Sequence, residues 1–213
     1  MRFLPLVTAL GALALVVTAA GCGGGGATKA AAAAGPPAKA CAHPVGWRKL
    51  ADRIGAPVYC PTWLPDPLTS QIGGKWNNID SVSKDRSYLI SFIWQDTDGP
   101  NLSGELHVNL RAYPGTTRIP TCEDTLVGGG KPRHVKLPCF ADPKPQRTIA
   151  GIRFTPYTVN QGADQWHLLY AWKHAGSLYT VSEHVAPPLT FAKVGRYLDR
   201  IVRGLVLIRP QQG

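Results

Sequence analysis

The residues of this chain that could do chemistry are scattered, and none completes a catalytic motif. Ser81 and Lys84 have the Ser-x-x-Lys spacing that, on a helix, places a lysine beside a nucleophilic serine. The pattern around them is polar and non-helical, and neither Ser-Asp-Asn nor Lys-Thr-Gly follows. The stretch Gly128-Gly129-Gly130-Lys131 lacks the Walker spacing of a phosphate loop. We therefore expect loops at both places and assign no catalytic residue.

Histidine is the other residue type that could carry chemistry here, through metal binding. The chain has six histidines without a His-Glu-x-x-His motif or an i, i+4 pair: His43, His107, His134, His167, His174 and His184. His107, His167 and His184 could share one face of a sheet, which the sequence neither requires nor excludes. Surface and turn histidines are the more common outcome, so we predict no metal site and no cofactor.

The N-terminus has the parts of a secretory signal over residues 1–21. Arg2 supplies positive charge, and residues 3–17 form an apolar stretch that is short for a membrane span. The run Thr18-Ala19-Ala20-Gly21-Cys22 then resembles the lipobox of bacterial lipoprotein precursors, with Ala19 where leucine is usual. This resemblance implies lipidation of the Cys22 thiol, cleavage before it and acylation of the new N-terminus. The alternative is an ordinary signal peptide, cut after Ala20 or Gly21.

The other cysteines agree with export. Of five cysteines, four remain once Cys22 is set aside: Cys41, Cys60, Cys122 and Cys139. Four cysteines in an oxidising compartment predict two disulfides in any of three pairings, of which locality favours Cys41–Cys60 and Cys122–Cys139. Each short loop would stabilise the fold by about 3 kcal/mol. A structural metal is the rival interpretation, but the Cys-x-x-Cys spacing is absent.

Composition divides the rest of the chain into a tether and one domain. After Cys22 the chain is nearly all Gly, Ala and Pro, so residues 22–40 are predicted to be a flexible spacer. Residues 41–210 have the usual size of a single extracytoplasmic domain. This layout resembles small actinobacterial-type lipoproteins of unassigned function, and the resemblance implies attachment to the extracytoplasmic face of the cell membrane.

Periodicity indicates how this domain is built. Trp47, Leu50, Ala51 and Ile54 fall at helical spacing before Gly55. The middle of the chain alternates as strands do, with residues 88–94 apolar enough for a strand covered on both faces. Thr190 can cap a last helix over residues 191–205. Its apolar stripe comprises Phe191, Val194, Leu198, Ile201, Val202 and Leu205. We predict an α+β fold: an antiparallel sheet of about five to seven strands, a C-terminal amphipathic helix on one face and a short N-terminal helix.

Charge and aromatic residues suggest where such a domain could bind. The net charge of +10 suits anionic neighbours such as lipid headgroups or phosphate-bearing wall polymers. One candidate surface is the helical stripe Lys193, Arg196, Arg200 and Arg203, and another is residues 131–136. Both sets of charges could instead serve only solubility. Aromatic side chains could line a groove for a sugar or peptide, although strand aromatics more often belong to the core: Trp63, Trp76, Trp94, Trp166, Trp172, Tyr88 and Tyr170.

Taken together, the residues favour a membrane-anchored binding, sensor or accessory module of the cell envelope. Its partners would be the membrane, through the lipid anchor, and an envelope protein or an anionic wall or lipid component; an exported chain is not expected to bind nucleic acid. The alternatives are an envelope enzyme of hydrolase type with an unrecognised active site and a structural or envelope-assembly protein. Because no catalytic motif is present, an enzyme is the less favoured interpretation.

Overall fold

A computed structural model describes residues 40–68, 82–95, 105–126 and 131–211 of the chain. The chain divides into two compact units, residues 1–37 and 38–213, and the described residues all belong to the second. The predicted signal, Cys22 and nearly all of the tether lie outside the described residues, as do Ser81 and residues 128–130.

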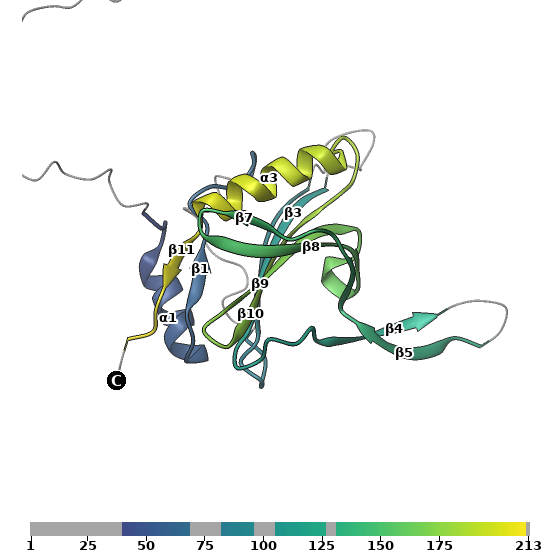
Figure 1. The fold of residues 1–213 in the computed structure, drawn as a ribbon, viewed down its shortest axis with the longest axis horizontal. Coiled ribbons are helices and arrows are strands. Elements are labelled where there is room, and N and C mark those ends of the chain that lie inside the picture. Colours follow the sequence, from purple (N-terminus) through teal and green to yellow (C-terminus); the bar gives the residue numbers. More distant parts are fainter. Residues whose placement is uncertain (1–39, 69–81, 96–104, 127–130, 212–213) are drawn as a thin grey trace, which may run out of the picture. The chain divides into compact units, whose positions relative to one another are not determined.

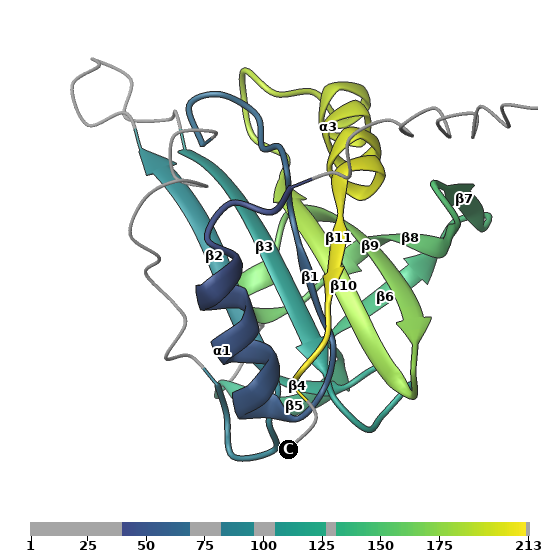
Figure 2. The same cartoon turned by 90° about the vertical axis from the view of Figure 1, so that its left-hand side faces the viewer.

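The second unit is built on an antiparallel sheet, as Figures 1 and 2 show. Its seven strands run in the order β2-β3-β10-β9-β8-β6, with β7 paired to β8. These strands are β2 (Tyr88–Gln95), β3 (Glu105–Tyr113), β6 (Phe140–Pro143), β7 (Arg147–Ile149), β8 (Ile152–Asn160), β9 (His167–His174) and β10 (Ser177–His184). Two further pairs are β1 (Val58–Cys60) with β11 (Val206–Ile208) and β4 (Thr121–Leu126) with β5 (Arg133–Pro138). With helices near both ends of this unit, the predicted α+β architecture is confirmed.

Helix α3 (Phe191–Gly204) packs against β9 and β10 on one face of the sheet. The Thr190 hydroxyl accepts a hydrogen bond from the Lys193 backbone N–H, which confirms the predicted N-cap. The buried positions of the helix follow the predicted stripe: Val194, Leu198, Ile201 and Val202. Phe191 departs from it, because this first-turn side chain is 52% exposed. The predicted helix is therefore confirmed, with its apolar face shorter than expected.

Helix α1 (Pro44–Ile54) packs beside the β1–β11 pair. Its buried face is the predicted one, comprising Trp47, Leu50, Ala51 and Ile54. The helix ends at Gly55, whose positive φ of 62° suits glycine, because a side chain there would be strained. No helix of the described part of the chain is long and apolar enough to cross a membrane.

Both predicted disulfides are present. Cys41 is joined to Cys60, which ties the segment before α1 to β1, and Cys122 is joined to Cys139, which ties β4 to the residue before β6. The local pairing is therefore the correct one of the three that four cysteines allow.

Three places in the strands differ from what alternation and hydropathy alone predict, the first being residues 88–94. β2 is an edge strand with one buried face, since Phe92 is buried but Ile93 is 43% exposed. Asn109 alternates with the apolar residues of β3, a pattern that suits a water-facing side, yet it is buried, because the 3-10 helix η1 (Gly162–Asp164) covers it. Ala150 fits the apolar alternation of Ile152 and Phe154, which suits a strand, but Ala150 and Gly151 form the β7–β8 turn with positive φ.

Candidate functional site

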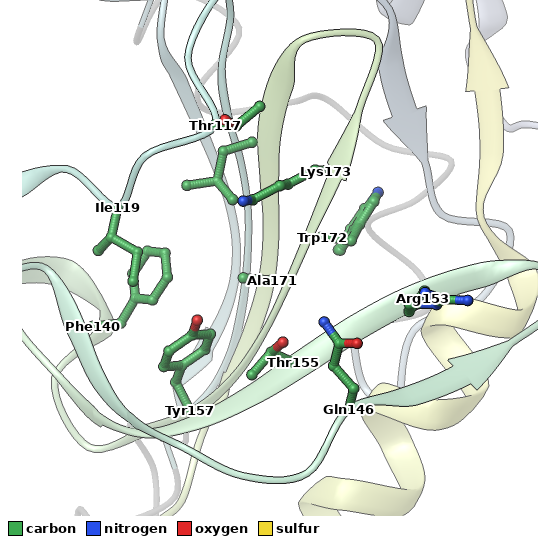
Figure 3. Close-up of a pocket in the computed structure, with 11 residues that line it drawn as sticks. Thr117, Ile119, Phe140, Gln146, Arg153, Thr155, Tyr157, Ala171, Trp172 and Lys173 are labelled. Carbon is green, nitrogen blue, oxygen red and sulfur yellow. The ribbon is translucent and has the colours of Figure 1, made fainter.

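A cavity of about 340 Å³ lies where β8, β9 and the β3–β4 connection meet (Figure 3). It opens on the sheet face opposite α3, because Ala171 and Leu178 line it while their neighbour Tyr170 reaches the α3 backbone. Its lining residues are Thr117, Ile119, Phe140, Gln146, Arg153, Thr155, Tyr157, Ala171, Trp172, Lys173 and Leu178.

Strand alternation positions most of this lining. Arg153, Thr155 and Tyr157 are alternate residues of β8 and therefore share one face. Thr155 pairs with Ala171 of β9, so the β8 side chains stand beside the β9 positions that line the same cavity. The two-residue turn at Ala150 and Gly151 begins β8, and the positive φ of both residues suits such a hairpin.

The floor of the cavity is a small hydrophobic cluster separate from the main core. Phe140, Ala171 and Leu178 are buried in it together with Cys139. The Tyr157 ring meets Phe140 edge to face, with 4.8 Å between ring centroids. Burial raises the pKa of the Tyr157 hydroxyl, so this group is a neutral hydrogen-bond donor at physiological pH. Apolar and aromatic atoms thus form the base, and polar groups stand around it.

The charged residues that line the cavity are all positive. Arg153 and Lys173 are its charged residues, both side chains are exposed, and none of the 11 lining residues is acidic. Among the ion pairs formed between described residues, none involves either cation. In Figure 3 the polar ends of Gln146, Thr155 and Tyr157 lie around the same space. This arrangement suits a small ligand that has an anionic group and an apolar part.

A second cavity, of about 360 Å³, lies between the start of α3 and the segment around β7, but its cations already have partners. Lys144 Nζ is 2.7 Å from Asp142 Oδ2, and Arg147 Nη2 is 2.6 Å from Asp199 Oδ2. The Tyr170 hydroxyl donates to Asp199 Oδ1 at 2.9 Å, and burial, followed by the Asp199 carboxylate, raises the pKa of Tyr170. Because these charges are compensated, the cavity is less suited to an anion than the first.

The predicted basic stripe lies on α3. Arg196, Arg200 and Arg203 are exposed, and Lys193 is half-buried. The Arg200 guanidinium lies 3.9 Å from the centroid of the Trp63 ring, so it stabilises the contact between α3 and the segment after β1 by a cation–π interaction. The use of this stripe as an anionic surface stays a prediction. The second predicted surface, residues 131–136, is mainly exposed on and beside β5.

The aromatic residues considered for a groove do not gather at one place. Trp172 lines the first cavity, Trp63 lies against Arg200 and Trp166 is 74% exposed. Tyr88 and Tyr170 belong to the main core. Trp76 and the side chain of Trp94 lie outside the described residues.

Three of the histidines do come together. His107, His167 and His184 lie in one row across β3, β9 and β10, on the sheet face opposite α3. The ring centroids are 4.3 Å apart for His107 and His167, 5.3 Å for His107 and His184, and 5.4 Å for His167 and His184. The sequence allowed this placement, but only the register of the strands produces it.

Ser182 and Asp164 adjoin this row, yet the group is not a nucleophilic triad. Ser182 Oγ donates to Asp164 Oδ1 at 2.6 Å and lies 2.9 Å from His167 Nδ1. The serine therefore stands between the histidine and the carboxylate, whereas in a catalytic triad the histidine stands between the other two. Ser182 is also 0% exposed, so its oxygen cannot reach a substrate.

No protein-family model, curated protein or solved structure matches this chain. Sequence reasoning did not single out Arg153 or Lys173. Each of the two residues lies on a strand of alternating polarity, and this alternation indicates which face of the strand the side chain occupies. It does not show which distant strands become neighbours and so form a cavity.

Proposed function

We propose that this chain is a lipid-anchored module of the cell envelope that binds a small anionic ligand in the cavity of Figure 3. The observation that carries the proposal is a pair of cations, Arg153 and Lys173, without a carboxylate among the lining residues and above an apolar floor. The lipobox-like run ending at Cys22 and the predicted spacer of residues 22–40 support the anchor.

The chemistry of the lining indicates which ligands fit. A guanidinium forms bidentate hydrogen bonds with carboxylate or phosphate, and an ammonium adds a second charged contact. The apolar part of the ligand would rest on Phe140 and Leu178, while the Tyr157 hydroxyl and the Gln146 amide could orient its polar groups. An anionic ligand with an aromatic or short aliphatic group could contact both the cations at the rim and the apolar floor of the cavity.

The test is calorimetric titration of the full chain in a neutral detergent with three soluble probes: phenyl phosphate, benzoate and benzyl alcohol. We expect binding of one or both anions and no detectable binding of the neutral alcohol. Arg153→Gln and Lys173→Gln should each weaken binding about 10–100-fold, since a charge-assisted hydrogen bond contributes about 1.5–3 kcal/mol. The matched control is Arg196→Gln, which removes an equal charge from the exposed face of α3.

The outcomes separate the cavity from the basic stripe. Equal binding by the two cavity variants and the native chain would refute the cavity as the site. If Arg196→Gln lowers affinity as much as the cavity variants do, the effect is one of net charge rather than of a specific pocket.

The anchor has a separate test. Cys22→Ser should move the protein from the membrane fraction to the soluble fraction, while its far-ultraviolet circular dichroism stays that of the native domain. Retention of the variant in the membrane fraction would refute lipidation at Cys22 as the means of attachment.

A further inference from the structure

The row of three imidazoles is joined to a buried hydrogen-bond network. Asp164 Oδ1 accepts from Ser182 Oγ at 2.6 Å and from Asn109 Nδ2 at 3.0 Å, and Arg111 Nε lies 2.9 Å from Asp164 Oδ2. Asn109 also donates to the Ala163 carbonyl at 2.9 Å. This network holds η1 on the sheet and fixes the groups that face His167.

The network determines the tautomer of His167. The Ser182 hydroxyl proton is directed to Asp164, so the contact of 2.9 Å between Ser182 Oγ and His167 Nδ1 requires Nδ1–H as the donor. The His167 side chain is 0% exposed and Nδ1 is its donor, so the buried ring is of the neutral form with one N–H. Its Nε2 therefore carries a lone pair rather than a proton.

That lone pair is buried and has no hydrogen-bond partner among the described residues. The His167 side chain is 0% exposed, and a buried acceptor without a partner costs about 1–3 kcal/mol. The Nδ1–H of His167 is held by a hydroxyl that is itself bound to a carboxylate, and Nε2 has no partner among the described residues. This is the form of a metal-binding histidine whose outer hydrogen bonds are in place.

We propose that His107, His167 and His184 form a binding site for a divalent transition-metal ion of the zinc type. Three imidazoles bound to one tetrahedral ion at the usual Zn–N distance have ring centroids about 5 Å apart, close to the 4.3, 5.3 and 5.4 Å found here. His107 and His184 are half-buried, so solvent borders the row and could supply the fourth ligand.

Two features of the site bear on this assignment. In the described part of the chain, no three Cys, His, Asp or Glu side chains stand where they could hold an ion, and this includes the three histidines as they are now oriented. Binding therefore requires the rings of His107 and His184 to turn about their χ angles, while His167 stays held by Ser182. The positive charge of Arg111 would oppose a cation, but it is compensated by Asp164.

The experiment titrates Zn²⁺ into the full, chelator-treated chain and follows binding by calorimetry, with Co²⁺ absorption as a second readout. We expect one ion per chain and the visible bands of four-coordinate Co²⁺. His107→Ala and His184→Ala, both at half-buried positions, should each weaken Zn²⁺ binding at least tenfold without loss of the folded circular dichroism spectrum. Ser182→Ala, which frees the His167 ring, should weaken it about 10–100-fold. His134→Ala is the matched control, because His134 is exposed on β5, outside the row.

Several results would overturn the proposal. They are the absence of saturable Zn²⁺ binding, native affinity in the folded His107→Ala and His184→Ala variants, or an equal loss of affinity in His134→Ala. The cavity of Figure 3 lies at the opposite ends of β9 and β10 from the histidines, where Lys173 and Leu178 line it. A failure of metal binding would therefore leave the proposed anion binding untouched.

Discussion

The buried glutamate of β10 gives the sharpest quantitative prediction. Glu183 is 0% exposed, and neither carboxylate oxygen has a hydrogen-bond partner among the described residues. It lies opposite Leu168 and Val108, on the sheet face that α3 covers. Burial raises the pKa of Glu183 to about 9 from 4.5, and Lys193 opposes only part of this rise. At neutral pH the folded protein therefore holds this side chain protonated.

This shift makes stability depend on pH. Below pH 4.5 the glutamate is neutral in both the folded and the unfolded chain, so it contributes no pH-dependent penalty. Between pH 4.5 and 9 only the unfolded chain loses the proton, and the free energy of unfolding falls as pH rises. By pH 7 the loss amounts to about 3 kcal/mol, at about 1.4 kcal/mol per pH unit.

Glu183→Gln removes the titration and keeps the shape of the side chain. Relative to the native chain, the variant should gain about 3 kcal/mol of unfolding free energy on going from pH 4 to pH 7. Urea unfolding followed by circular dichroism at both pH values measures this difference, and other titrating groups cancel because both proteins share them. Glu123→Gln is the control, since the Glu123 side chain is 77% exposed. A stability difference for Glu183→Gln that is the same at pH 4 and pH 7 would refute the reasoning.

Three further predictions concern the stability of the fold. Asp164→Asn should lower the free energy of unfolding by about 3 kcal/mol in urea titrations, because its amide would face Arg111 Nε as a second donor; an unchanged midpoint would contradict this. Replacing Cys122 and Cys139 by serine should cost about 3 kcal/mol, with native stability in thermal unfolding as the contrary result. Gly176→Ala should destabilise the fold by about 1 kcal/mol, because the φ of +73° strains any residue with a side chain. Gly195→Ala should stabilise the fold by up to about 1 kcal/mol, because alanine favours the helix and the added Cβ meets only ordinary contacts on α3. Equal shifts in melting temperature for the two alanine variants would show that backbone conformation does not govern the effect.

Local patterns in the sequence were sufficient for the helices and for the hairpin turn between β9 and β10, but not for the turn at Ala150 and Gly151. The stripe of α3 and its Thr190 cap depend on residues three or four positions apart, which helical geometry alone brings together. The turn at Ala175 and Gly176 depends on two residues that adopt positive φ. The disulfides followed the same logic, since each joins cysteines fewer than twenty residues apart, at separations of 19 and 17.

Alternation shows which face of β10 Glu183 occupies, but it does not show the environment of that face. Tyr179, Val181 and Glu183 alternate along β10 and so point to one face. The raised pKa arises only because α3 and the neighbouring strands cover that face and leave the carboxyl without a partner.

The sequence by itself determined the two amphipathic helices, the Thr190 cap and the α+β class, because each depends on residues close along the chain, and it favoured one of the three cysteine pairings. The tertiary structure decided the two candidate binding sites. His107 joins His167 and His184 only through the register of β3 on β10, and Arg153 reaches the same cavity as Lys173 only through the pairing of β8 with β9. Strand alternation shows which face a residue occupies, but the pairing of distant strands depends on the packing of the whole sheet.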